Sequence, residues 1–278
     1  MKTRSAIALA IKWAIIIVVL AFMYLPLVVI VVYSFSAAKT VGADFGSFTF
    51  ALYPKLFSNE ALIKATMNSI IIGLVSALFA TILGTTAAVG IHYMRRKSKV
   101  VVEASSQITV VNTEIVTAMG FFLLMIFLRD SALLPVNFGL RWLIISHTVI
   151  TTPYVLLTVS PRLKQLNPHL LEASMDLGAG PMRSLVTVML PQLAGAMVSG
   201  FALAFTLSLD DFVVTRINSV GANIETISTF VYSRITKQNF PTEIRALSTI
   251  IFVTVLTVLI VYNVIKINRS KKTAKQKI

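Results

Sequence analysis

Three acidic residues stand inside or directly beside long apolar runs, where an ionised side chain is costly. Glu114 interrupts the apolar stretch 103–128, and Asp210 and Asp211 directly follow the apolar stretch 184–209. On insertion scales, a charged side chain at the bilayer centre costs about 2.5–3.5 kcal/mol. Carboxylates spaced along a low-dielectric passage can balance the charges of a cation that moves through it. These three acids are therefore candidates to line the path of a positively charged substrate.

Each acid also has a purely structural explanation, which the sequence leaves open. Glu114, roughly 16 Å along a continuous helix, would lie near the membrane midplane and could form an internal ion pair or be protonated. Asp210 and Asp211 could mark the outer end of a helix and pair with Arg216. Adjacent helical residues point in directions about 100° apart, so an unbroken helix aims only one aspartate at a central path. Aromatic rings that could face a cation or simply pack are Phe205, Phe212 and Tyr232.

The composition requires a nonaqueous environment for the elements that carry these acids. Of 278 residues, 56% are hydrophobic and 13% charged, against about 45–50% and about 25% in soluble domains. The net charge of +14 comes largely from short basic clusters between apolar runs, which is typical of membrane proteins rather than of nucleic-acid binding. A helix needs roughly 20 apolar residues to cross a bilayer. The sequence therefore predicts an all-α integral membrane protein with about six transmembrane helices: 13–38, 65–94, 103–128, 142–161, 184–209 and 246–265.

The distribution of Lys and Arg predicts the orientation of these helices. With six spans both termini lie on one side, and 16 of the 25 Lys and Arg residues belong to that side. The positive-inside rule then places both termini in the cytoplasm, with 269–278 as a basic cytoplasmic tail. Residues 1–12 precede an apolar run that is too long for a signal peptide and is not soon followed by a small-x-small cleavage site, so we interpret it as a retained first helix.

The second and fifth predicted helices carry small residues at four-residue spacing, which places these residues on shared faces. Such faces allow close helix approach, so we expect them in the bundle interior or at a subunit contact. Ordinary packing within the one chain explains the pattern equally well. The residues are Gly73, Ala77, Ala80, Gly84 and Ala88 in one helix, and Ala196, Gly200, Ala204 and Ser208 in the other.

The segment 162–191 differs from the other loops because it contains two helix starts. Asn167 can cap a helix that has Pro168 at its first position, and Gly178 is placed to end that helix. The Gly-Pro pair at 180–181 then begins a second helix. A simple connection needs no second capped start. The pattern therefore predicts a rigid element at the cytoplasmic surface that presents itself to a partner outside the membrane.

Residues of this segment resemble the EAA motif of bacterial ABC importer permeases. The glycine follows the glutamate by six residues and the proline follows it by nineteen, as in the family, while a serine replaces the second alanine. In that family the motif forms a coupling helix that docks into a cleft of the cytoplasmic ATPase. The resemblance implies that the ATPase-coupling residues are Glu172, Ala173, Ser174, Gly178, Leu190 and Pro191.

Further stretches narrow the resemblance to PotC-type permeases of spermidine/putrescine importers. These stretches are 24–27, 33–36, 171–179 and 205–214, and the likeness extends from about residue 12 to 265. The paired acids Asp210 and Asp211 are its most telling part. Thr113 stands where the family often has proline before the acid. The resemblance implies transport of polyamines along a path that includes Glu114, Asp210 and Asp211.

The same resemblance implies a single permease domain over 1–278 with the MetI-like bundle of type I importers, located as a multi-pass protein in a bacterial inner membrane. Three protein partners are implied: a homodimeric cytoplasmic ATPase that binds ATP and Mg, a second homologous permease subunit, and an extracytoplasmic polyamine-binding protein. The chain itself is expected to contact membrane lipid but no nucleic acid, and to hold no cofactor, metal or catalytic residue.

Motifs that the sequence lacks limit the other functions it could have. It has no Gly-x-x-x-x-Gly-Lys-Ser/Thr, no His-Glu-x-x-His, no nucleophile elbow and no cysteine, and His92, His147 and His169 lack metal-ligand spacing. Energy for transport is therefore expected from a partner. Two alternatives remain. One is an ABC permease for another solute, such as thiamine, iron, molybdate or sulfate, although an anion path would favour basic linings. The other is an ion-driven transporter or intramembrane enzyme in which Glu114 carries a proton.

Overall fold

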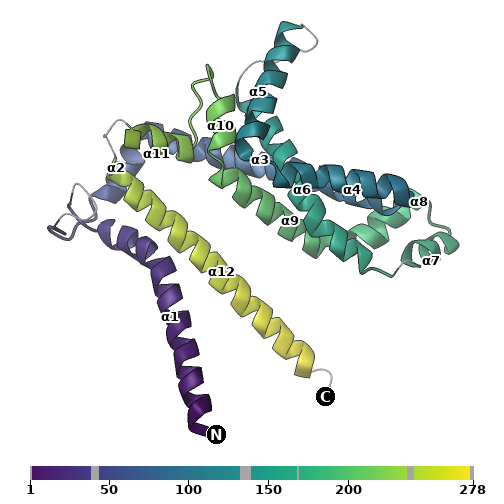
Figure 1. Ribbon diagram of the computed structural model, residues 1–278, viewed down its shortest axis with the longest axis horizontal. Helices are drawn as coiled ribbons and strands as arrows, with labels where there is room; N and C mark the ends of the chain where they lie inside the picture. The colour runs from purple at the N-terminus through teal and green to yellow at the C-terminus, as the bar shows by residue number, and fades with distance from the viewer. Residues whose placement is uncertain (1, 39–43, 132–138, 168, 237–240, 276–278) are drawn as a thin grey trace. The chain divides into compact units, whose positions relative to one another are not determined.

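The computed structural model describes residues 2–38, 44–131, 139–167, 169–236 and 241–275 of the chain. Within these ranges every extended regular element is a helix, and strand-like pairing is limited to one isolated bridge between Ser36 and Phe48. The chain divides into two compact units (Figure 1). The first contains Met1–Ile63 and Arg234–Ile278, and the second contains Lys64–Ser233. The all-α prediction is confirmed, while the single permease domain stays a prediction.

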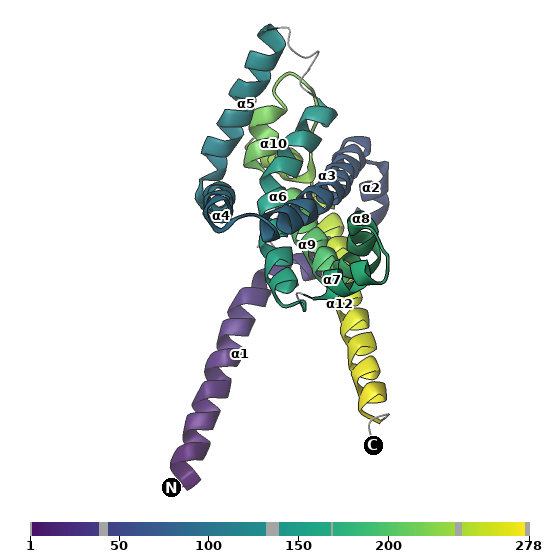
Figure 2. The ribbon, with the colours of Figure 1, turned by 90° about the vertical axis from the view of Figure 1, so that its right-hand side faces the viewer.

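The first unit is built on two long helices, α1 (Lys2–Tyr33) and α12 (Glu243–Lys275), with the short α2 (Leu52–Ser58) packed against α12. None of the most apolar window of α1 is buried within the chain, as expected for a helix whose partners are lipid or other subunits. Figures 1 and 2 place the first turn of α1 and the last turn of α12 at the same end of this unit. Which side of the membrane this end faces stays a prediction.

A buried arginine joins α12 to the end of α1. Arg245 is 3% exposed and donates hydrogen bonds to the carbonyl oxygens of Tyr33 at 3.3 Å and Ala38 at 2.6 Å, as well as to Thr242 O at 3.3 Å. The last carbonyls of a helix lack intrahelical partners and carry partial negative charge. Arg245 therefore satisfies carbonyls at the α1 terminus, and these bonds offset the cost of burying its own charge.

The second unit holds the candidate site, and its helices follow one another with short connections (Figure 1). Most of α3 and of α11 belongs to it, and each of these two helices has a few residues in the first unit. Its elements are α3 (Glu60–His92), α4 (Arg96–Val111), α5 (Glu114–Asp130), α6 (Leu140–Lys164), α7 (Leu170–Asp176), α8 (Pro181–Ser184), the π-helical turn η1 (Leu185–Met189), α9 (Leu190–Asp210), α10 (Val213–Asn218) and α11 (Ile227–Thr236).

Among the described residues, four helices are long and apolar enough to cross a membrane. They are Ile11–Tyr33, Glu60–His92, Leu140–Lys164 and Pro181–Asp210, and the bent pair α4–α5 makes a fifth if it crosses as one span. These four correspond to the first, second, fourth and fifth predicted helices. The sixth predicted span, 246–265, lies within α12, which is helical throughout, but several of its side chains lie outside the described residues, so the count does not include it.

The prediction of one continuous third helix over 103–128 is wrong. The chain bends by 104° between α4 and α5, and Asn112 and Thr113 at the bend are extended, with ψ angles of 148° and 141°. Asn112 Oδ1 accepts the Thr113 N–H at 3.1 Å, and Asn112 Nδ2 donates to Thr117 Oγ1 at 3.3 Å. Such local side-chain bonds compete with helical backbone bonds, so the break forms without proline. The midplane depth inferred for Glu114 assumed a straight helix, so the bend removes its basis and the depth of Glu114 in the membrane stays untested.

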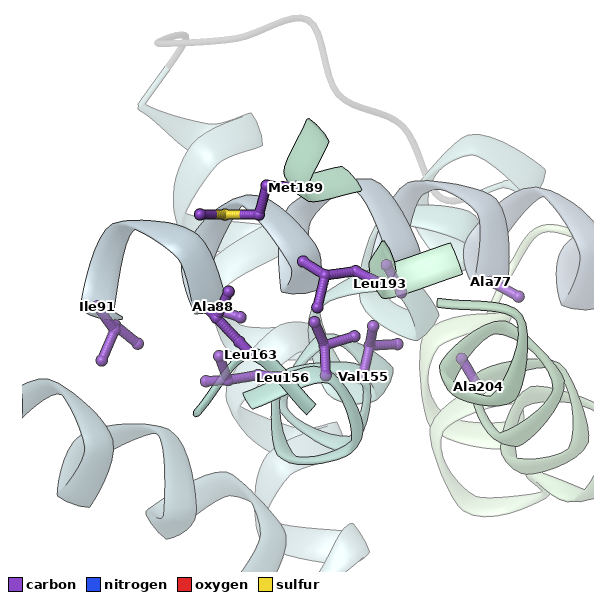
Figure 3. Close-up of a cluster of buried hydrophobic side chains, with 11 residues drawn as sticks. Ala77, Ala88, Ile91, Val155, Leu156, Leu163, Met189, Leu193 and Ala204 are labelled. Atoms are coloured by element: carbon purple, nitrogen blue, oxygen red, sulfur yellow. The ribbon is translucent and has the colours of Figure 1, made fainter. Parts of the chain in front are cut away.

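Close packing of α3, α6 and α9 forms the core of this unit. Val155 on α6 lies between two glycines: a Cβ on Gly84 would lie 2.7 Å from Val155 Cβ, and a Cβ on Gly200 would lie 3.1 Å from Val155 Cγ1. Figure 3 shows Ala77, Ala88, Val155, Leu193 and Ala204 among the buried side chains of this cluster. The predicted small-residue faces thus pack within this chain.

Gly84→Ala is expected to destabilise the protein, whereas Gly90→Ala on the same helix is not. The added methyl at position 84 forces α3 and α6 apart, at a cost of about 1–3 kcal/mol, while nothing lies within 4 Å of the Cβ position of Gly90. Alanine otherwise favours a helix by roughly 1 kcal/mol over glycine. Thermal unfolding of both purified variants checks this, and an equal midpoint for the two would contradict the close packing at Gly84.

Candidate functional site

A cavity of about 170 Å³ lies where the α4–α5 break, the middle of α6 and the α9–α10 break meet. All three sequence-predicted acids line it, although 96 residues of chain separate Glu114 from Asp210. Hydroxyl and aromatic side chains share the wall with the acids. The lining residues are Thr109, Asn112, Glu114, Thr117, His147, Ile150, Thr151, Tyr154, Leu207, Ser208, Asp210, Asp211, Phe212 and Val214.

Two of the three carboxylates are free to bind a ligand. Glu114 is in the first turn of α5, and Asp210 is the last residue of α9. Both side chains are exposed, and neither forms a hydrogen bond or ion pair with any described residue. The amide end of α5, where Glu114 lies, carries partial positive charge. The cavity thus presents two separate, unneutralised negative groups.

The third carboxylate, Asp211, is fully occupied by the protein. Its oxygens accept hydrogen bonds from the backbone N–H of Val214 at 3.3 Å and of Thr215 at 2.9 Å, and from the Thr215 hydroxyl at 3.0 Å. These amides belong to the first turn of α10, which has no helical partner for them. Asp211 thereby caps α10, and its charge suits that helix end.

A buried histidine joins the elements behind the acids. His147 on α6 is 2% exposed, with Nδ1 2.7 Å from Ser208 Oγ on α9 and Nε2 3.1 Å from Thr215 Oγ1 on α10. Its Nε2 also lies 3.6 Å from Asp211 Oδ2. His147 is therefore a buried polar residue of α6 whose ring nitrogens both have partners within the protein.

Asn218 holds α10 against its other neighbours. Its side chain is fully buried, accepts the Trp142 indole N–H of α6 at 3.1 Å, and donates to Ala118 O of α5 at 3.2 Å. Figure 2 shows α10 beside α5 and α6. Each polar group of the Asn218 amide has a partner, so these bonds fix α10 at the cavity wall.

The sequence left open an ion pair between Arg216 and the aspartates Asp210 and Asp211. Arg216 is exposed and forms no ion pair with Asp210 or Asp211 among the described residues, so the aspartates are not neutralised by it. No described group of three or more His, Asp or Glu side chains is arranged to hold a metal ion.

The three candidate aromatic residues have different positions. Phe212 lines the cavity and contacts Tyr232, with ring centroids 4.6 Å apart. Phe205 instead packs where α3 and α9 meet, because its ring would touch a Cβ on Gly73 at 3.0 Å. Only Phe212 therefore offers a ring to a cation, and Tyr154 adds another that the sequence did not single out.

The segment between α6 and α9 forms the predicted short helix, turn and second helix, but α7 begins at Leu170 with His169 rather than Asn167 at its N-cap, and Pro168 lies outside the described residues. Asn167 Oδ1 accepts the His169 N–H at 3.0 Å as α7 begins. Gly178 has φ +87°, and its N–H bonds Met175 O at 2.9 Å while Ala179 N–H bonds Ser174 O at 3.2 Å. This is the Schellman pattern, in which a left-handed residue ends a helix.

Apolar side chains project from this turn and are not covered by any described part of the chain. Leu177 is 90% exposed and Met182 is 72% exposed. The turn beneath them is stiffened because the Ser174 hydroxyl donates to the buried Ser184 hydroxyl at 2.9 Å. The serine that replaces the alanine of the motif thus links α7 to α8. Glu172 and Ala173 are exposed on α7, and the Glu172 carboxylate lies 2.9 Å from His169 Nδ1.

The Leu190-Pro191 pair explains the π-helical turn η1. Proline lacks the N–H that an α-helix would use at position 191, and the Leu190 N–H bonds the carbonyl of Leu185, five residues back. A π turn commonly marks a functional site in a helix. The pair therefore lies at the start of the long helix α9, which ends at Asp210.

Sequence reasoning missed the partners of Asp211, although a periodic signal was present. Ser208, Asp211, Thr215 and Asn218 follow one another at spacings of three, four and three residues, which is the repeat of one helix face. On α6, His147, Thr151 and Tyr154 repeat in the same way and line the same cavity. Two polar stripes within apolar helices could have predicted that these faces meet.

Comparison with known proteins places the chain among transport components. A family model described as "Binding-protein-dependent transport system inner membrane component" matches residues 80–271. The spermidine/putrescine transport system permease protein PotC of Escherichia coli K12 is 32% identical over 90% of this chain and 92% of its own. The putrescine transport system permease protein PotI of the same strain is 33% identical over 86% of this chain and 85% of its own.

A solved structure supports the fold independently. A crystal structure of a bacterial ABC transporter involved in the import of the acidic polysaccharide alginate has a TM-score of 0.70 and 17% identity, and covers 94% of each chain. A second structure of the bacterial alginate transporter, in complex with an alginate pentasaccharide-bound periplasmic protein, gives a TM-score of 0.68. At this identity the likeness shows the fold alone.

The two adjacent aspartates are expected to differ in their effect on stability. Asp211→Ala removes the α10 cap and should cost about 0.5–2 kcal/mol, whereas Asp210→Ala removes a side chain without protein partners and should leave stability unchanged. Thermal unfolding of the two purified variants measures the difference. Equal midpoints would show that the Asp211 hydrogen bonds do not hold α10.

Proposed function

Because this chain belongs to the binding-protein-dependent transport system inner membrane components, we propose that it is the permease subunit of an ABC importer that moves polyamines into a bacterial cytoplasm. As an inner-membrane component it is a transport subunit and not an enzyme. Relatives that are spermidine/putrescine and putrescine permeases support the substrate class. The observation that carries the proposal is that Glu114 and Asp210 lie in one cavity without a hydrogen-bond or ion-pair partner among the residues that the structure describes.

The cavity chemistry suits a slender cation with several ammonium groups. Glu114 and Asp210 come from different helices and can each balance one positive charge. The Phe212 and Tyr154 rings and the neighbouring hydroxyls can accept the remaining N–H donors or contact the methylene chain. A volume of about 170 Å³ is below the roughly 300–1,000 Å³ of pockets for drug-sized ligands, so a narrow ligand fits best.

Other cargo classes fit this lining less well. Sulfate or molybdate would meet two negative groups in the cavity without a compensating arginine or lysine among its lining residues. The alginate importer has a similar fold, but at 17% identity this likeness does not indicate the substrate of this chain. An ion-driven mechanism with Glu114 as proton carrier would not explain the rigid turn between α7 and α8. Polyamines are therefore the preferred substrate class over these alternatives.

The energy is proposed to come from a homodimeric cytoplasmic ATPase that docks on the turn between α7 and α8. Exposed Leu177 and Met182 on a capped, hydrogen-bonded turn form an apolar surface that a protein partner can cover. Glu172, Ala173, Ser174 and Gly178 build this turn, and Leu190 and Pro191 connect it to α9. A second permease subunit is proposed to complete the path, and an external binding protein to deliver the polyamine.

Reconstitution tests the proposed function directly. The chain is coexpressed with its candidate ATPase, sister permease and binding protein, purified as a complex and placed in proteoliposomes. Spermidine or putrescine uptake that requires ATP, together with polyamine-stimulated hydrolysis, is the expected result. Uptake of sulfate or thiamine in place of polyamines would overturn the substrate assignment, and uptake that needs no ATPase would overturn the mechanism.

Asp210→Asn and Glu114→Gln should each lower the maximal rate of polyamine uptake, by about tenfold if one charged contact is lost. The concentration for half-maximal uptake should change little, because the proposed binding protein captures the ligand first. The matched control is Asp130→Asn, which neutralises an exposed acid at the far end of α5, outside the cavity. Normal uptake by both cavity variants would remove these acids from the substrate path.

Leu177→Asp should abolish ATPase attachment while the chain still folds, because the side chain is 90% exposed and has no packing to lose. Leu177→Met preserves the apolar surface and is expected to keep copurification with the ATPase. Pull-down of the ATPase by each tagged variant measures the effect. Undiminished capture by the aspartate variant would show that the ATPase docks elsewhere.

A further inference from the structure

The His147 side chain connects three helices at the cavity without being available to a ligand. It is 2% exposed, and both ring nitrogens have protein partners, Ser208 on α9 and Thr215 on α10. A buried imidazole between two hydroxyls and a carboxylate is a more specific arrangement than apolar packing requires. Each hydrogen atom of this network can be assigned to one acceptor.

The hydrogen bonds have one consistent direction. The Thr215 hydroxyl donates its only hydrogen to Asp211 Oδ2 at 3.0 Å, so Thr215 Oγ1 must accept from His147 Nε2–H at 3.1 Å. In the neutral imidazole, Nδ1 is then the acceptor and takes the Ser208 hydroxyl hydrogen at 2.7 Å. The chain of donors runs from Ser208 through His147 and Thr215 to Asp211. It ends on a carboxylate whose other bonds cap α10.

We propose that His147 is a positioning residue of the substrate path, which orients Thr215 and Asp211 so that the neighbouring Asp210 carboxylate faces the passing polyamine. This inference rests on the proposed function and deepens it. Asp211 fixes the turn between α9 and α10, and Asp210 is the residue directly before that turn. The direction of the Asp210 side chain therefore depends on bonds that begin at His147.

The network also assigns different roles to the paired acids. The Asp211 oxygens accept hydrogen bonds from two backbone amides and one hydroxyl, so they have little capacity left to bind an ammonium group. Asp210 lines the cavity with no protein partner among the described residues. His147 thus serves substrate binding through Asp211, and of the two adjacent aspartates only Asp210 meets the substrate.

Loss of the imidazole should be tolerated by the fold, which makes the inference testable. In His147→Leu the Ser208 hydroxyl can turn to the carbonyl four residues back in α9, and the Val214 and Thr215 amides still hold Asp211 as the cap of α10, while the Thr215 hydroxyl loses the donor that orients it. His147→Gln places a side-chain N–H close to the position of Nε2 and can still donate to Thr215. Ser146→Ala is the matched control, because Ser146 is a fully buried α6 residue outside the cavity whose hydroxyl bonds only Trp142 O.

The experiment uses the complete reconstituted complex and measures spermidine uptake and ATP hydrolysis in the same vesicles. We expect His147→Leu to lower the amount of spermidine moved per ATP by about tenfold with the complex still assembled, and His147→Gln to recover most of it. Ser146→Ala should match the wild type. Equal transport per ATP in His147→Leu and Ser146→Ala would overturn the inference, as would a loss that the Gln variant does not rescue.

A double-mutant cycle tests whether His147 acts through its proposed partner. The combination of His147→Leu and Thr215→Val should transport about as poorly as the worse single variant, because both changes break the same chain of bonds. Fully additive losses would contradict it. The proposed function is judged separately in the wild-type complex: if that complex transports no polyamine, the substrate class fails, whereas normal wild-type uptake with unaffected His147 variants refutes only the positioning role.

Discussion

Backbone amides at the end of a membrane helix need partners that lipid cannot supply, and here a carboxylate supplies them. Asp211 accepts two backbone amides of α10 and so allows the chain to leave α9 at Asp210 and start a new helix at Val213, after only Asp211 and Phe212. At the other side of the cavity, the Asn112 side chain acts in a similar way between α4 and α5, because it accepts a backbone N–H there. The cavity exists because both helices break, and both breaks depend on short polar side chains that bond the backbone locally.

The two breaks determine which charges are free. A carboxylate that caps a helix is neutralised by amide dipoles, whereas the residue beside it keeps its full charge for a ligand. Asp210 and Asp211 illustrate this within one dipeptide: Asp211 holds the turn, and Asp210 lines the cavity without a partner among the described residues. Two adjacent acids in a membrane helix therefore need not both bind a ligand.

The sequence predicted best the local structure that depends on residues close together in the chain. The turn between α7 and α8 follows from Asn167, Gly178 and Pro181, whose local effects on the backbone act wherever the chain lies, and the resemblance to the permease family was equally readable. The bend before Glu114 was missed because Asn112 and Thr113 carry a weaker signal than proline. That Glu114 and Asp210 share a cavity depends on this bend and on the packing of α6, for which the polar stripes on α6 and along 208–218 were the only sequence signal.

The close packing of α6 and α9 gives the proposed transport cycle a mechanical basis. α9 has 21 residues, or roughly 32 Å of helix, and it reaches from the π turn at its start to Asp210 at its end. Gly200 brings its backbone against Val155 with no intervening side chain, so the two helices cannot separate without losing that contact. A displacement of the α7–α8 turn by a docked ATPase would therefore reach the α9–α10 break as a rigid movement of α9. The free carboxylate at that break is the group whose position such a movement changes most directly.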